Sequence, residues 1–64
     1  MRLDSMLKIL GICPTGGIAK VLIQAGEVRV NGSVEMRRGR KLRPGDVVDV
    51  TGAGAYRIIE EVTQ

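Results

Sequence analysis

The residues with the clearest chemical potential form a run of cations near the middle of the chain. Between positions 37 and 43 lie five cationic side chains and no acidic one: Arg37, Arg38, Arg40, Lys41 and Arg43. The other 57 residues carry five cations and seven acids, so one basic segment sits on a slightly acidic body. Cations that neutralise phosphates release condensed counterions, and such a segment therefore favours a polyanion. The alternative is a solvated, charged loop that only increases solubility.

The composition excludes most catalytic and metal-binding chemistry. Histidine is absent and Cys13 is the only cysteine, which removes zinc sites, disulfide frameworks, Cys–His dyads and Ser–His–Asp triads. Asp46 and Asp49 have no accompanying nucleophile, metal-ligand set or cofactor motif that would make them a catalytic pair. We therefore expect a protein that is not an enzyme and that has no metal, no cofactor and no small-molecule substrate.

The length and the remaining composition bound the architecture and the environment. A chain of 64 residues allows a single domain over residues 1–64, and folding at this size hides only about 60% of the surface. No apolar run is long enough for a membrane helix, and the N-terminus lacks the apolar core of a signal peptide. With a lone thiol, these features predict a cytoplasmic protein. No strongly apolar surface stripe is evident, so we expect a monomer.

The spacing of apolar residues predicts a short first helix. Its apolar stripe follows the helical period: Leu3, Met6, Leu7 and Leu10. Asp4 is expected to cap the start of this helix, and Gly11 to end it in a left-handed conformation. Lys8 falls off the stripe and should face solvent.

A second helix is predicted after Thr15, its expected N-cap, and before Gly26, its expected terminator. The apolar stripe of this helix is expected to contain four residues: Ile18, Val21, Leu22 and Ala25. Glycine inside a helix costs about 1 kcal/mol against alanine, so Gly16 and Gly17 need a reason. Two explanations remain open. One is the close approach of an anion to the helix N-terminus, and the other is a loop that needs positive φ or tight packing.

After Gly26 the period of the sequence changes to two, which predicts strands. The dipeptide Asn31-Gly32 usually signals a two-residue hairpin turn. We predict a three-residue loop instead, because that register pairs Val30 with Val34 and Val28 with Met36. Apolar side chains would then share one face of the hairpin.

The C-terminal half predicts further strands separated by turns. Residues 43–46 predict a turn with Gly45 at positive φ, residues 47–50 a strand, and residues 51–54 a second turn. A last strand is expected from Tyr56 toward Val62, with a frayed end. The predicted fold is α+β, with two N-terminal helices followed by a small, mostly antiparallel sheet of three to four strands.

An ordered set of motifs runs along the chain: Arg2-Leu3-Asp4, Leu7, Thr15, Ala19, Ile23, Gly26, Val28, Val30-Asn31-Gly32, Pro44-Gly45-Asp46 and Val48. This set resembles the S-four RNA-binding domain, a family named for small-subunit ribosomal protein four. Residues 15–20 and 37–42 are similar to the short, stand-alone bacterial members. The resemblance implies an αL-type motif, in which the helix pair and the adjoining hairpin present one surface to structured ribosomal or transfer RNA. It also implies association with the ribosome and a role in its assembly or in translation.

The resemblance also implies a set of RNA-binding residues. On the helix pair they are Lys8, Thr15, Gly16, Lys20 and Gln24, and on the hairpin and the basic segment they are Asn31, Arg37, Arg38, Arg40 and Lys41. To these we add Gly17, for its backbone N–H, and Arg43, as the last cation of the basic segment. Many family members have arginine directly after the Ser or Thr that opens the second helix, where this chain has Gly16. The phosphate contact of that side chain is lost, and backbone N–H groups of Gly16 and Gly17 are candidates to replace it.

The side chains present indicate how RNA would be bound and leave one main alternative function. Tyr56 is the only aromatic residue, so we expect phosphate and ribose contacts to a folded RNA and not the stacking of splayed bases. Arginine, which binds phosphate in bidentate fashion, predominates in the basic segment. The alternative function is a protein-interaction adaptor that docks this segment on an acidic protein. Nuclease sensitivity of the copurifying material distinguishes RNA binding from this alternative.

Overall fold

The computed structural model describes residues 1–59, which form two helices followed by four strands. The elements are α1 (Leu3–Ile9), α2 (Gly16–Gln24), β1 (Val28–Val30), β2 (Ser33–Val34), β3 (Val47–Val50) and β4 (Gly54–Arg57). This arrangement confirms the predicted α+β fold. Within the described residues, no helix is both long enough and apolar enough to cross a membrane.

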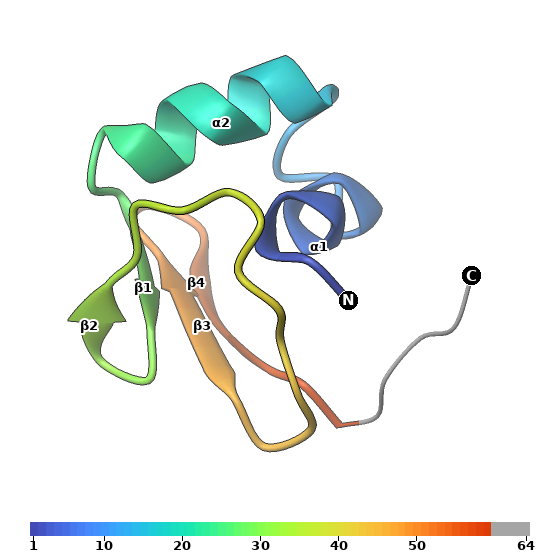
Figure 1. Cartoon of the computed structure of the whole chain (residues 1–64), viewed down its shortest axis with the longest axis vertical. Coiled ribbons are helices and arrows are strands. Elements are labelled where there is room, and N and C mark those ends of the chain that lie inside the picture. Colours follow the sequence, from blue (N-terminus) through green and yellow to red (C-terminus); the bar gives the residue numbers. More distant parts are fainter. Residues whose placement is uncertain (60–64) are drawn as a thin grey trace.

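The four strands form one antiparallel sheet in the order β2-β1-β3-β4, with both helices packed against it (Figure 1). Alternation along the two central strands buries the residues of one face, namely Val28, Val30, Val48 and Val50. These valines join the helices in one apolar core, which also contains Leu3, Met6, Leu7, Cys13, Ala19, Ile23, Leu42 and Ile58. The helices are therefore held in place by the sheet, and their starts take fixed positions beside the connection between β2 and β3.

Helix α1 buries Leu3, Met6 and Leu7 as predicted, whereas Leu10 lies beyond the helix and is exposed. The expected cap by Asp4 is wrong, because the N-cap is Arg2 and Asp4 lies inside the first turn. A side-chain cap at Arg2 is unnecessary, since backbone carbonyls of the β2–β3 connection accept hydrogen bonds from the first N–H groups of the helix.

Helix α2 begins as predicted, with the Thr15 hydroxyl accepting a hydrogen bond from the Ile18 N–H at 3.2 Å. The predicted apolar stripe is wrong. Ala19 and Ile23 are the buried residues, whereas Val21 is 68% exposed. Six of the eight residues from 18 to 25 are apolar, so the period alone allows several buried faces, and packing against α1 and the sheet selects one.

The predicted register of the first hairpin is also wrong. Val30 pairs with Ser33 across a two-residue turn, with Asn31 at φ 53° and Gly32 at φ 85°. The prediction assumed that Val34 faces the core, but Val34 is half-exposed. The inward position next to it is taken by a buried acid, Glu35.

The turn over residues 43–46 and strand β3 form as the sequence predicts, whereas β4 differs in its bounds. The turn over residues 43–46 forms, with Gly45 at φ 95° and the Asp46 N–H bonded to the Arg43 carbonyl at 3.0 Å. β3 has the predicted bounds, whereas β4 starts earlier than predicted and ends at Arg57. The predicted continuation of the last strand through Ile58 and Ile59 is wrong, because neither residue is in a strand. Its further course toward Val62 and its frayed end lie outside the described residues.

Candidate nucleic-acid interface

The basic segment is bonded to the start of α1 along its backbone. Arg2 forms an antiparallel bridge with Lys41, and the Leu3 N–H donates to the Arg40 carbonyl at 2.8 Å. The Asp4 N–H donates to the Arg38 carbonyl at 3.1 Å. Figure 1 shows this connection, in yellow, passing beside α1 on its way from β2 to β3. The segment is therefore an ordered part of the fold and not a loop held only by its two ends.

Glu35 is a buried carboxylate at the start of this connection, with a side chain only 9% exposed. Its Oε2 accepts hydrogen bonds from Nε of Arg37 at 3.1 Å and from the Arg37 backbone N–H at 3.2 Å. Its Oε1 accepts from Nη1 of Arg40 at 2.9 Å and from Nη2 of Arg37 at 3.3 Å. The hydrogen bonds from Arg37 and then Arg40 lower the pKa of Glu35 to about 2. Glu35 therefore binds both arginines in its charged form.

Asp4 is a second buried carboxylate, 8% exposed, in the first turn of α1. Its Oδ2 accepts from Nε of Arg38 at 2.9 Å and from Nη2 of Arg2 at 3.3 Å, and its Oδ1 accepts from the Ser5 N–H at 2.8 Å. Burial alone would raise the pKa of Asp4, but the bonds from Arg38 and Ser5 and the charge of Arg2 outweigh it and lower the pKa. Asp4 therefore connects the basic segment to the N-terminus of the chain.

Arg38 also lies against the start of α2. Its Nη2 is 3.1 Å from the position that a Cβ on Gly16 would occupy. The space that a side chain at position 16 would need is thus filled by a guanidinium from the basic segment, which explains a glycine at this costly position by close packing. Arg38 consequently bridges α1, through Asp4, and α2, through Gly16.

Among residues 1–59, the other expected site residues form no ion pairs. Those on the helices or the basic segment with exposed side chains are Lys8, Lys20, Gln24, Lys41 and Arg43. Gly17 is also exposed and follows Gly16 in the first turn of α2. Asn31 differs from them, because its Oδ1 accepts from the Val47 N–H at 2.9 Å and its Nδ2 donates to Asp46 at 3.1 Å. The Asn31 amide thus joins the hairpin turn to β3.

Sequence reasoning missed the two buried acids and Arg2. Positions 37–43 contain no acid, but Glu35 and Asp4, which lie outside that run, each bind two arginines of the same surface. For Glu35 there was a local signal, since an acid stands two residues before the first arginine of the run. For Asp4, which the family resemblance includes in Arg2-Leu3-Asp4, nothing in the sequence indicated the contact with Arg38, because 34 positions separate the two residues.

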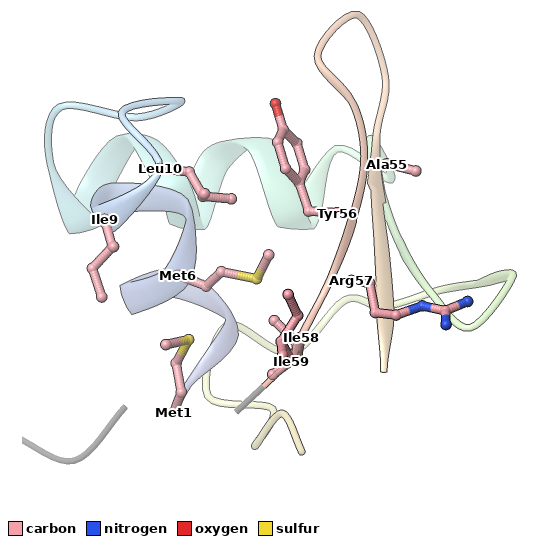
Figure 2. A pocket seen from close by; sticks show the side chains of 9 residues that line it. All are labelled: Met1, Met6, Ile9, Leu10, Ala55, Tyr56, Arg57, Ile58 and Ile59. Atoms are coloured by element: carbon pink, nitrogen blue, oxygen red, sulfur yellow. The ribbon is translucent and has the colours of Figure 1, made fainter. Parts of the chain in front are cut away.

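A second surface feature is a groove of about 510 Å³ between α1 and β4 (Figure 2). Figure 2 shows Met6, Ile9 and Leu10 on one side of this groove and Tyr56 and Ile58 on the other. Among the described residues that line the groove, Arg57 is the one with a charged side chain. In the described part of the chain, no group of three or more Cys, Asp or Glu residues could hold a metal ion.

Comparison with known proteins identifies the class to which this fold and basic surface belong. The sequence matches the family model of the S4 domain over residues 1–59. The chain belongs to the S4 domain family, as its motifs predicted.

Individual relatives include both short proteins and a larger one. The chain is 40% identical over 59 residues to the "Probable ribosome maturation protein RlbA" of Bacillus subtilis, covering 92% of this chain and 83% of that protein. It is 36% identical over 52 residues to the "Putative RNA-binding protein YbcJ" of Escherichia coli, covering 81% and 74%. It is 39% identical over 61 residues to "Small ribosomal subunit protein uS4" of Acaryochloris marina, covering 95% of this chain but only 30% of that protein.

Proposed function

We propose that this protein binds structured RNA, ribosomal or transfer RNA, without catalysing a reaction, and acts in ribosome assembly or translation. The observation that carries the proposal is the position of Arg38, which joins the basic segment to the starts of both helices through Asp4 and Gly16. These contacts bring the basic segment next to the helix pair, which supports its assignment to RNA binding. The names of the relatives, which refer to ribosome maturation, a ribosomal subunit and RNA binding, support the same function.

The surface suits the ribose–phosphate backbone of a folded RNA. Its arginines present planar donor groups that match phosphate oxygens, and the described residues include one aromatic side chain, Tyr56, whose hydroxyl donates to the Ala53 carbonyl. We assign phosphate contacts to the following residues: Lys8, Lys20, Arg37, Arg38, Arg40, Lys41 and Arg43. Thr15, Gly16, Gly17 and Gln24 complete the helix-pair side. Recognition by RNA shape follows from such contacts.

Asn31 has a different part in this proposal. Both ends of its amide are used by Val47 and Asp46, so its side chain positions the hairpin turn. We propose that its contribution to RNA binding is through the shape of that turn. We also propose that the protein acts in the cytoplasm and as a monomer.

The test uses cations outside the ion pairs, because loss of Arg37, Arg38 or Arg40 would leave a buried acid with a missing partner. The test variant is Lys41→Ala/Arg43→Ala. The matched control, Arg29→Ala/Arg57→Ala, removes the same charge from exposed positions on β1 and β4. Binding to purified bacterial ribosomal RNA is measured between 50 and 300 mM salt, as experimental conditions. We expect the test variant to lower the slope of log K against log salt by about 2, or about 1 per phosphate contact.

The control pair should change that slope by much less. Equal effects of the two pairs would mean that net charge alone governs binding, and would contradict the proposed surface. Copurification from cells tests the rival adaptor function. Material bound to this protein should be released by ribonuclease, and a partner that withstands the nuclease would favour an acidic protein in place of RNA.

A further inference from the structure

Two buried acids lie within a surface that is otherwise suited to a polyanion. Glu35 and Asp4 are 7% and 6% exposed as whole residues. Removal of a carboxylate from water is costly, and each negative charge also repels a phosphate backbone. An arrangement that served only to attract RNA by charge would therefore omit both acids. Their presence needs a reason besides charge density.

The contacts of Glu35 show what such an acid does to its neighbours. It binds Arg37 through Nε and Nη2, and Arg40 through Nη1. A guanidinium has five N–H donors, so each arginine keeps donors that the carboxylate does not use. The Arg37 side chain is 75% exposed. Glu35 therefore binds two guanidinium groups at once, and the side chain of Arg40 stays 32% exposed.

Asp4 binds a second pair of arginines, and two glycines lie close to the same guanidinium groups. It binds Nε of Arg38 and Nη2 of Arg2. A Cβ on Gly16 would lie 3.1 Å from Arg38 Nη2, and one on Gly39 would lie 3.4 Å from Arg2 Nη2. Each guanidinium thus lies against both the shared acid and the backbone of a glycine.

We propose that Glu35 and Asp4 are positioning residues, which set the orientation of four arginines so that the surface distinguishes folded RNA from unstructured RNA. The inference rests on the proposed function. Arginine loses considerable rotamer freedom when it is held in one geometry. If the buried acids impose that geometry before binding, a rigid RNA of matching shape gains affinity and a flexible strand gains little.

The proposal predicts an effect opposite in sign to that of simple electrostatics. Glu35→Gln raises the net charge by one, so charge alone would tighten binding to every RNA. Loss of orientation should instead weaken binding to folded RNA. The matched control is Asp49→Asn, which makes the same change in charge at an exposed position on β3. Comparison of the two variants separates geometry from charge.

The experiment measures the dissociation constants of two probes, purified ribosomal RNA and poly(U) of similar length, by filter binding at one salt concentration. For Glu35→Gln and for Asp4→Asn we expect affinity for ribosomal RNA to fall about tenfold and affinity for poly(U) to stay equal or rise slightly. Asp49→Asn should tighten both slightly. If Glu35→Gln tightens both probes as the control does, the acids serve only the fold and the positioning proposal is overturned.

A second variant keeps the proposal testable if loss of an acid unfolds the protein. Gly16→Ala changes no charge, but its Cβ would lie 3.1 Å from Arg38 Nη2 and would displace that guanidinium. Affinity for ribosomal RNA should fall for Gly16→Ala while affinity for poly(U) stays equal, and a ribosomal RNA affinity equal to that of the wild type would overturn the proposal. If the wild type fails to bind ribosomal RNA, the proposed function itself fails, which is a different result.

Discussion

Acid should destabilise this protein mainly through Glu35. The pKa of Glu35 is lowered from its ordinary value of 4.5 to about 2 in the folded protein by hydrogen bonds from Arg37 and Arg40. A carboxyl group with a lowered pKa stabilises the fold above its unfolded pKa and loses that contribution as the pH falls through the folded value. The loss should therefore begin near pH 4.5 and be almost complete at about pH 2.

The size of the effect follows from the same values. At 1.36 kcal/mol per pKa unit, the difference between 4.5 and about 2 gives an upper limit of about 3 kcal/mol. Arg37 is 75% exposed, so water screens its part of the interaction and we expect on the order of 1–2 kcal/mol. A domain of this length has a total stability of roughly 3–10 kcal/mol, which makes the change measurable.

The assay is urea unfolding, followed by far-ultraviolet circular dichroism, of the wild type and Glu35→Gln at several pH values from 7 to 2. The wild type should be more stable than the variant at neutral pH, and the two curves should converge in acid. Asp4, whose pKa is also lowered, titrates in both proteins and cancels in the difference. A difference in unfolding free energy that stayed constant from pH 7 to 2 would refute the assignment of this stability to the Glu35 charge.

Two further predictions concern the hairpin turn and the buried thiol. Asn31→Ala removes both amide hydrogen bonds and places alanine at φ 53°, so it should lower the unfolding free energy by about 1–2 kcal/mol. An unchanged urea midpoint would show that the turn does not need the amide. Cys13 is 2% exposed, and burial raises the pKa of its thiol. A thiol reagent should therefore react at least about 100-fold more slowly with the native protein than with the urea-unfolded protein. Equal reaction rates would contradict the burial of Cys13.

Local chemistry in the sequence was sufficient to predict the order and type of the elements. The Thr15 cap, the left-handed glycines at positions 26 and 45 and the strand over residues 47–50 all depend on neighbours within a few positions. Turn and cap preferences arise from local backbone sterics and short-range hydrogen bonds, which a sequence displays directly. The basic segment was recognised for the same reason, since its charges are adjacent in the chain.

The buried face of α2 and the register of the first hairpin were decided by tertiary packing. Residues 18–25 are apolar on several sides, so only contact with α1 and the sheet selects Ala19 and Ile23. In the hairpin, the inward position after Val34 is held by an acid whose partners lie in the next segment. Neither outcome follows from a hydrophobic period, because the period counts residues and does not show what each side chain meets.

The sequence by itself determined the α+β element order and the presence of one concentrated positive segment. Only the tertiary structure decided how that segment is oriented, because Arg38 meets Asp4 across 34 positions and lies on Gly16 of a second helix. Charge is a property of composition, whereas the direction of a guanidinium depends on which buried carboxylate and which bare backbone the fold brings against it.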